Sequence, residues 1–292
     1  MINYQVKELA YYPGCTLKNG AAELEKSFLF VCDALDFHLE ELPKWNCCGT
    51  VFSLQQDVLV YHLASVRNLI RAKEASKKAI VAPCSICYNT LKQVLDFLRN
   101  NPDSLNKINE FMFEEKTKFS LGDVDVLDVI GFFRDVIGYE RFVKSAKHRL
   151  NGMRIAVYYG CLHSRPRNAA SCEIEMPNAI EQLLGQLDAI CTEYPMKNEC
   201  CGSYLRVKDP TIPLERVRRI VKSASLNGAE LIATLCPLCY DNIKNLQKRL
   251  EREGSGFKIL PVVYLSQILA MCLGAPKEIY NPKSEPVPAF SS

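Results

Sequence analysis

Ten of the fourteen cysteines in this chain of 292 residues form one pattern that occurs twice. Each copy has one cysteine after a glycine, then a Cys-Cys-Gly segment, then Cys-x-x-Cys. The first copy comprises Cys15, Cys47, Cys48, Cys84 and Cys87, and the second comprises Cys161, Cys200, Cys201, Cys236 and Cys239. The gaps are 31 and 35 residues in the first copy and 38 and 34 in the second. The pattern therefore predicts a five-cysteine site in each half of the chain.

Metal binding explains these thiols better than disulfide bonding does. Residues 1–6 lack the basic start and apolar run of a secretory signal, and no stretch approaches the roughly 18 uninterrupted apolar residues of a membrane span. We therefore expect a cytoplasmic protein without a transmembrane segment, in a compartment where thiols stay reduced. The net charge of +3 is too small to indicate nucleic acid or a membrane surface as a partner.

Five thiolates exceed the needs of the common thiolate sites. Structural zinc takes four ligands, and a cubane iron-sulfur cluster also takes four, one for each iron. The fifth cysteine is therefore either structural or bridges two irons in a noncubane cluster. In an extended strand Cys47 and Cys48 would point to opposite faces, so the backbone must turn there, and we expect Gly49 and Gly202 to supply that turn with positive φ.

Two other interpretations stay open for the cysteines. A Cys-x-x-Cys that follows a strand and opens a helix is also typical of dithiol redox proteins, although such a site has no need of the other three cysteines. Zinc in one of the sites is a second possibility, because thiolates alone do not identify a metal. The four cysteines without a counterpart in the other half are expected to be buried apolar residues: Cys32, Cys172, Cys191 and Cys272.

The segments around the cysteines predict an α/β fold of two pseudo-twofold-related lobes, each a small parallel sheet flanked by helices. Apolar strands are expected at residues 9–12, 79–82, 155–159 and 231–234, and helices at 21–35, 57–74, 177–186 and 214–225. Residues 126–133 and 262–269 should begin as strand and continue as helix. Each strand that precedes a cysteine should deliver it to the carboxyl edge of its sheet, where ligands of parallel sheets gather.

These elements divide the chain into three parts. An N-terminal lobe would cover residues 1–150 and a C-terminal lobe residues 151–275, with the boundary near Asn151 and Gly152. Residues 276–292 form a proline-rich tail that is expected to be too polar to pack as an element.

This pattern resembles the duplicated CCG cysteine-rich domain of the B-type subunits of heterodisulfide reductase. The resemblance runs from about Leu9 to Gly274 and includes Tyr-Pro-Gly-Cys, Trp-Asn-Cys-Cys-Gly and Cys-x-x-Cys-Tyr as well as the spacing. The same domain occurs in subunits of some succinate, glycolate, lactate and glycerol-3-phosphate oxidoreductases and of thiol:fumarate reductase. Many of those carry a ferredoxin-like module, C-x2-C-x2-C-x3-C-P, which this sequence lacks.

The resemblance implies a noncubane [4Fe-4S] cluster on the five cysteines of each half, with the two clusters facing each other. A disulfide, such as that of coenzymes M and B, would bind between them and be cleaved, its sulfurs binding iron before reduction to two thiols. Electrons would come from a ferredoxin-like C-type subunit, itself fed by a flavin-containing A-type subunit. Neither Gly14-Cys15-Thr16 nor Gly160-Cys161-Leu162 has the Gly-x-Gly-x-x-Gly of a dinucleotide fingerprint, so we expect the electrons to arrive from outside this chain.

Two other functions remain alternatives. A CCG subunit of the succinate, fumarate, glycolate or lactate type would relay electrons without disulfide chemistry. A zinc-stabilised scaffold would neither relay electrons nor cleave a disulfide. Near the cysteines, Lys18, Arg165 and Arg206 are candidates for binding anionic groups of a substrate, or else form a solvated surface. His163, two residues after Cys161, is a candidate proton donor to a departing thiolate, or else a structural histidine.

Overall fold

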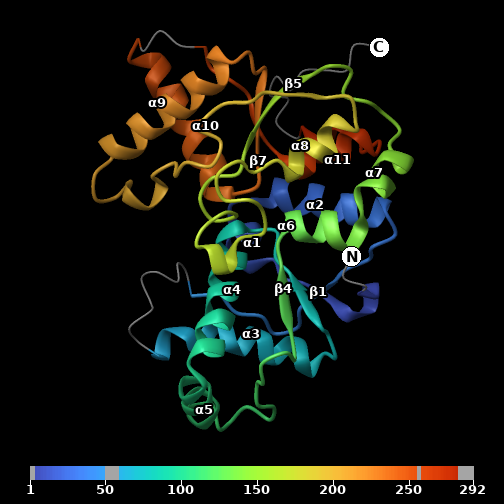
Figure 1. Cartoon of the computed structure of the whole chain (residues 1–292), viewed down its shortest axis with the longest axis vertical. Coiled ribbons are helices and arrows are strands. Elements are labelled where there is room, and N and C mark those ends of the chain that lie inside the picture. Colours follow the sequence, from blue (N-terminus) through green and yellow to red (C-terminus); the bar gives the residue numbers. More distant parts are fainter. Residues whose placement is uncertain (1–3, 50–58, 255–257, 282–292) are drawn as a thin grey trace.

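The computed structural model describes residues 4–49, 59–254 and 258–281. Two lobes are stacked along the long axis, with the N-terminal lobe below and the C-terminal lobe above (Figure 1). Each contains a four-stranded parallel sheet flanked by helices, and the strand orders, β2-β1-β3-β4 and β6-β5-β7-β8, are the same. The expected α/β fold of two similar lobes is confirmed.

The N-terminal lobe contains these elements in chain order: η1 (Val6–Glu8), β1 (Leu9–Tyr11), α1 (Gly14–Asn19), α2 (Ala22–Ala34), β2 (Glu40–Glu41), η3 (Leu59–His62), α3 (Leu63–Glu74), β3 (Ala79–Val81), α4 (Ser85–Asn100), α5 (Pro102–Phe111), β4 (Asp125–Leu127), α6 (Val129–Gly131), the π-helical η4 (Phe132–Ile137) and α7 (Tyr139–Ser145). The C-terminal lobe contains β5 (Arg154–Tyr158), η5 (Arg167–Ala169), α8 (Ala179–Gly185), β6 (Ile190–Cys191), η6 (Ser203–Leu205), α9 (Thr211–Leu226), β7 (Leu231–Thr234), α10 (Pro237–Arg252), β8 (Val262–Tyr264), α11 (Leu265–Cys272) and α12 (Lys277–Tyr280).

Buried apolar strands form the middle of both sheets. Every residue of β1, β3 and β7 is buried, which parallel strands covered by helices on both faces require. The register pairs Ala10 with Ile80, and Ile80 with Val126. The edge strands β2 and β6 are not predicted by the sequence, because each is two residues long and too short for a periodic pattern. In β2 both of those residues are also exposed glutamates.

Helices of the two lobes pack against one another between the sheets. Helix α2 of the N-terminal lobe lies against α11 of the C-terminal lobe, and α6 and α8 occupy the same middle layer (Figure 1). Ser27 and Ser266 share a buried hydrogen bond of 2.7 Å across this contact. The buried residues of both lobes form one continuous hydrophobic core. The position of one lobe relative to the other is therefore fixed by packing.

The start of the tail does form an element, contrary to expectation. Helix α12 packs against α2 and α11, and the Gln267 side chain donates a 3.0 Å hydrogen bond to the Tyr280 carbonyl. Ile279 and Tyr280 give this short helix an apolar side, which packs on the core. Residues 282–292 of the tail lie outside the described residues. Within the described residues, no helix combines the length and apolarity of a membrane span.

Replacement of Phe28 by alanine is expected to lower the free energy of unfolding by about 3–5 kcal/mol, because a cavity would open in the core. Phe28 is fully buried in α2, and its ring contacts those of Tyr11, Phe132 and Phe133. Denaturant unfolding followed by circular dichroism measures this change. The control is Phe113→Ala. Because the Phe113 side chain is 79% exposed, this substitution should change the free energy of unfolding by no more than about 0.5 kcal/mol. Equal effects of both substitutions would contradict the assignment of Phe28 to the core.

Candidate cysteine sites at the lobe boundary

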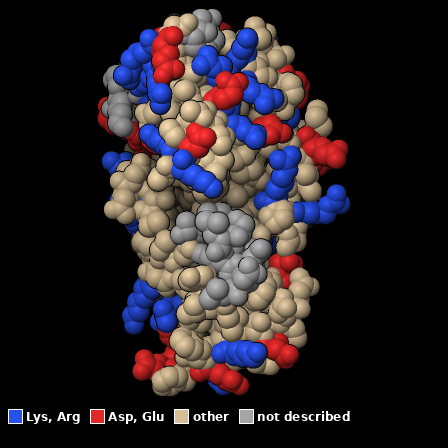
Figure 2. Space-filling view, turned by 90° about the vertical axis from the view of Figure 1, so that its left-hand side faces the viewer, with Lys and Arg blue, Asp and Glu red and all other residues tan. Residues whose placement is uncertain are grey.

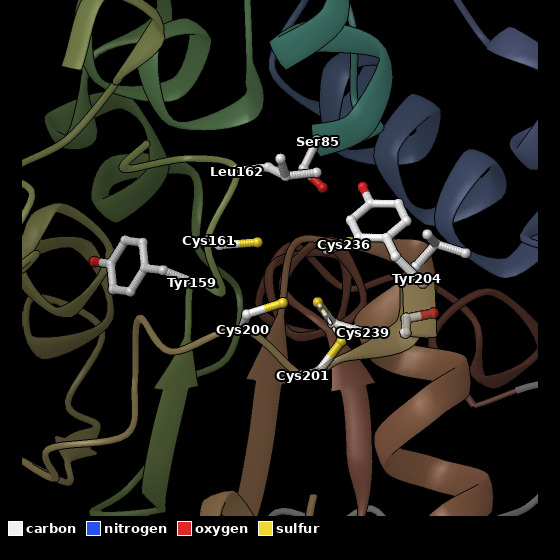
Figure 3. A pocket seen from close by; sticks show the side chains of 11 residues that line it. Ser85, Tyr159, Cys161, Leu162, Cys200, Cys201, Tyr204, Cys236 and Cys239 are labelled. Atoms are coloured by element: carbon white, nitrogen blue, oxygen red, sulfur yellow. Dashed lines mark hydrogen bonds between the residues drawn. The ribbon is translucent and has the colours of Figure 1, made fainter. Parts of the chain in front are cut away.

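One cavity in the C-terminal lobe is lined by all five cysteines of the second copy, which we call the C-terminal site: Cys161, Cys200, Cys201, Cys236 and Cys239. The cavity has about 290 Å³ of atom-free space, part of it open to solvent. The sulfur atoms of Cys161, Cys200, Cys201 and Cys239 point into this space (Figure 3). The Sγ atoms of Cys201 and Cys239 are 3.6 Å apart.

The ends of two neighbouring strands position the C-terminal site. Strand β5 ends at Tyr158, shortly before Cys161, and Cys236 is the N-cap of α10 after β7. Gly202 has a φ of +78°, so the backbone turns after the paired cysteines as predicted. Gly160 also has positive φ, and a Cβ there would lie 3.2 Å from the Cys239 sulfur. Glycine therefore allows the first cysteine segment to approach the Cys-x-x-Cys segment closely.

The cysteines of the first copy are gathered in the same way, at what we call the N-terminal site: Cys15, Cys47, Cys48, Cys84 and Cys87. The Sγ atoms of Cys15 and Cys47 are 3.7 Å apart, as are those of Cys48 and Cys87. Cys84 is the N-cap of α4, and hydrogen bonds with Cys48 first and then with Cys84 raise the pKa of Cys87.

Two glycines shape the N-terminal site. Gly49 has a φ of +92°, which is the turn expected after Cys48. A Cβ on Gly14 would lie only 2.7 Å from the Cys87 sulfur, so a side chain there would displace that cysteine.

In the C-terminal site, a hydrogen bond between two thiols raises the pKa of the donor and lowers the pKa of the acceptor. Cys161 donates to Cys200 and thereby lowers the pKa of Cys200 to about 6, although burial opposes this. Cys239 acts in the same way on Cys236, whose pKa is also lowered to about 6. The pKa values of the two donors are raised. Each pair thus stabilises one thiolate, which is the form that binds metals.

The thiols do not surround a single point. Among the described residues, no group of three His, Cys, Asp or Glu side chains is arranged to hold a single metal ion. The close sulfur contacts are instead pairwise in both sites.

The two sites approach each other at the boundary between the lobes. Ser85, which directly follows Cys84 in the N-terminal lobe, lines the cavity of the C-terminal site (Figure 3). Tyr204 of the C-terminal lobe lines the same cavity, and its pKa is raised first by burial and then by cysteines of both lobes, including Cys84 and Cys236. Side chains of both lobes therefore surround one region.

His163 connects the lobes through a buried hydrogen bond. Its Nδ1 lies 2.6 Å from Oδ2 of Asp128, the N-cap of α6 in the N-terminal lobe. Asp128 also accepts hydrogen bonds from the Gly131 N–H and the Ser171 hydroxyl. Burial raises the pKa of Asp128, but the hydrogen bond and charge of His163, together with the hydrogen bonds from Ser171 and Gly131, outweigh burial, and the pKa is lowered overall. The Nε2 atom of His163 is buried and has no hydrogen-bond partner within the described part of the chain.

The three predicted anion-binding residues do not line the cavity of the C-terminal site. Lys18 binds Glu25 and Glu41, at 2.6 and 2.8 Å, and Arg206 lies 2.9 Å from Asp241. The Arg165 side chain is exposed. On the face seen in Figure 2, Lys and Arg gather on the upper, C-terminal lobe with acidic residues among them, and the surface is hollowed where the lobes meet. A substrate-binding role for these three residues stays a prediction.

Several residues of this region are not predicted by the cysteine pattern. Ser85, Leu162, Tyr204 and Leu238 line the cavity, although none has a chemical signature apart from its closeness to a cysteine. Asp128 does have a signal, because an aspartate before an apolar run is typical of a helix N-cap. Its partnership with His163 depends on how the lobes are packed, which the sequence does not specify.

The four cysteines without a counterpart in the other half of the chain lie outside both sites. Cys32 and Cys272 are buried in the core, as expected. Cys172 and Cys191 are only partly buried. Burial nevertheless raises the pKa values of Cys172 and Cys191 to about 12.

A family model for the CCG cysteine-rich domain matches residues 9–92 and 155–244, which together make up more than half of the chain. The chain is 26% identical over 271 residues to the 8-methylmenaquinol:fumarate reductase membrane anchor subunit of Wolinella succinogenes, covering 92% of this chain and 93% of that protein. It is 28% identical over 271 residues to a protein of Archaeoglobus profundus that is named as similar to the B-type subunit of heterodisulfide reductase, covering 89% of each.

A third relative is the B-type subunit of the ferredoxin/F420H2-dependent CoB-CoM heterodisulfide reductase of Methanosarcina acetivorans, 25% identical over 279 residues, with 93% of this chain and 91% of that protein covered. Among solved structures, a hypothetical protein from Helicobacter pylori matches with a TM-score of 0.73 and 14% identity. The match covers 94% of this chain and 50% of that one. At this identity the likeness concerns the fold alone.

Alkylation of Cys172 and Cys191 in the native protein at pH 8 is expected to be on the order of a thousandfold slower than in the unfolded chain. The reason is that a thiol with a pKa near 12 is almost fully protonated, whereas a free cysteine has a pKa near 8.5. The native rate should rise with pH from 8 to 11. Anaerobic iodoacetamide labelling with peptide mass spectrometry measures both rates, and urea-unfolded protein is the control. Equal native and unfolded rates at pH 8 would contradict the raised pKa values.

Proposed function

The chain belongs to the CCG cysteine-rich domain family, and from this premise we propose that it is the catalytic iron-sulfur subunit of a heterodisulfide reductase. In this role it would cleave a disulfide and reduce it to two thiols between two noncubane [4Fe-4S] clusters. One observation carries the proposal: Ser85, the neighbour of Cys84 in the N-terminal site, lines the cavity of the C-terminal site. A disulfide at the lobe boundary would then have both sites within reach.

The chemistry of the donor set fits such clusters. Each site gathers five thiols, which are soft ligands of the kind that iron-sulfur clusters use. The lowered pKa values of Cys200 and Cys236 supply ready thiolates. The ligands would be the ten cysteines of the N-terminal and C-terminal sites. When bound, each cluster would supply one-electron transfer, and two together meet the two-electron need of disulfide reduction.

Other residues would then orient the substrate and handle protons. His163 is held by Asp128 through Nδ1, which leaves the buried Nε2 as the atom that would hold a proton for a departing thiolate. Arg165, which has an exposed side chain, is the most available of the three basic candidates, since Lys18 and Arg206 are engaged by carboxylates. An anionic substrate group would bind Arg165.

The proposal includes partners and a compartment. Two of the relatives described above are named as subunits of larger reductases, and the name of the Methanosarcina acetivorans protein describes its reductase as ferredoxin/F420H2-dependent. We infer a ferredoxin-like C-type subunit as the electron donor and a flavin-containing A-type subunit that feeds it, with the complex in the cytoplasm.

A second candidate is a role in relaying electrons without disulfide chemistry. The relative from Wolinella succinogenes favours it, because the similarity to that fumarate reductase subunit extends over 92% of this chain. Both candidates need the same clusters, and they differ in whether the lobe boundary binds a disulfide.

Anaerobically purified protein is expected to contain about eight iron and eight sulfide ions per chain, four of each for each cluster. Cys48→Ala and Cys201→Ala should each remove about half of both, because each disrupts one site. The control is Cys272→Ala, at a buried cysteine outside the sites, which should leave the content unchanged. Zinc with little iron or sulfide would contradict the proposal and favour a zinc-stabilised scaffold.

A disulfide substrate is expected to change the paramagnetic spectra of both clusters when it is added to the protein, because its two sulfur atoms would reach both sites at the lobe boundary. A thiol product such as coenzyme M has one thiol sulfur and is expected to change the spectrum of one cluster. Electron paramagnetic resonance measures the change, and an alcohol of the same shape as the thiol is the control. Spectra unaffected by a panel of disulfides and thiols would favour the relay role instead.

A further inference from the structure

One buried hydroxyl extends from the N-terminal lobe into the C-terminal site. Ser85 is fully buried, and its Oγ makes no hydrogen bond of ordinary geometry among the described residues, although the Cys236 thiol lies within its reach. Figure 3 shows Ser85 at the end of α4 with its oxygen directed toward the cavity that the five sulfur atoms line. A buried hydroxyl without a well-formed hydrogen bond is costly, so this donor indicates an acceptor in the cavity, either the Cys236 sulfur or a group bound among the five thiols.

Helix α4, which carries Ser85, also favours a negatively charged group in this cavity. Helix α4 has 16 residues and begins at Ser85, so its unpaired N–H groups and the positive end of its dipole lie at this edge of the cavity. The Ser85 hydroxyl lies within hydrogen-bonding reach of the Cys236 thiol. Negative charge on sulfur is therefore favoured on this side of the boundary.

The matching position in the other lobe offers no such donor. Alignment of Cys84-Ser85-Ile86-Cys87 with Cys236-Pro237-Leu238-Cys239 places Pro237 opposite Ser85 at the start of α10. Proline has neither a hydroxyl nor a backbone N–H. The second copy therefore has no donor at the position that matches Ser85.

A second pair of matching positions differs in the same direction. Alignment of Cys15-Thr16-Leu17 with Cys161-Leu162-His163 sets buried Leu17 against His163, whose Nε2 is buried and unpartnered among the described residues. At these two pairs the polar group belongs to the surroundings of the C-terminal site, whereas at the pair Thr16 and Leu162 the hydroxyl belongs to the N-terminal site, 3.9 Å from the Cys15 Sγ. The duplication keeps the ten cysteines but not the groups around them.

We propose that Ser85 makes the two sites unequal: its hydroxyl donates a hydrogen bond to a sulfur atom of the C-terminal site, so that a cluster there has a higher reduction potential than one in the N-terminal site. Hydrogen bonds to cluster or ligand sulfur stabilise the more negative, reduced state. The inference rests on the proposed iron-sulfur occupancy of both sites. The C-terminal site would be the one that is reduced first.

Potentiometric titration followed by electron paramagnetic resonance tests the inference on the loaded protein. Cys48→Ala and Cys201→Ala assign the signals to the two sites. In Ser85→Ala the potential of the C-terminal signal should become more negative while that of the N-terminal signal stays the same, so that the gap between them narrows. Pro237→Ala is the matched control in the other lobe and should move neither signal, because no donor is lost.

The pair Ser85→Thr and Ser85→Val separates hydrogen bonding from packing, since the two side chains have nearly the same shape and only threonine has a hydroxyl. Threonine should preserve the potential gap and valine should narrow it, and this comparison decides the matter even if Ser85→Ala loses iron. Equal C-terminal potentials in the threonine and valine variants, or equal shifts of both signals, would overturn the inference. Absence of iron and sulfide in the unsubstituted protein would instead refute the proposed function.

Discussion

Close contact between sulfur atoms is the constraint on which the rest of this structure depends. Thiols lie 3.6–3.7 Å apart in both sites, and most of them are buried. Neighbouring buried thiolates repel each other and lose their hydration, so either protons or a cationic centre must accompany them. The opposed pKa values of Cys161 and Cys200 follow from this constraint, because the pair keeps one proton between two sulfurs. Bound iron would replace those protons.

Packing between the lobes maintains the distance between the two sites. Helices α2 and α11 join the lobes through a shared core, and the Asp128–His163 hydrogen bond crosses the boundary close to the cysteines. Asn89 adds a further connection, because its side chain donates hydrogen bonds of 2.9 Å to the carbonyls of Leu162 and Arg165 in the segment after Cys161. The lobes therefore act as one rigid support. A substrate between the sites would meet groups that are already in place, which lowers the entropic cost of binding.

Much of the fold could be predicted from the sequence because strands and cysteines occur in a fixed order. Buried apolar runs end just before Cys15, Cys84, Cys161 and Cys236, and carboxyl ends of parallel strands meet at one edge. Other features have no local signal. The two-residue strands β2 and β6 depend on pairing with β1 and β5, and α12 depends on the core against which Ile279 and Tyr280 pack. Ser85 follows a cysteine in the sequence, but its place in the opposite lobe's cavity is a tertiary property.

The asymmetry around the duplicated cysteines bears on what the two sites do together. If two clusters were equivalent in potential and surroundings, an arriving electron would have no preference between them. With a donor at Ser85 and none at Pro237, the C-terminal site would hold the first electron. For a relay such an order gives direction to electron flow, whereas for disulfide cleavage it determines which of the two sulfurs is reduced first. In both cases unequal hydrogen bonding around equal ligands gives a duplicated chain an order that its ten cysteines alone do not provide.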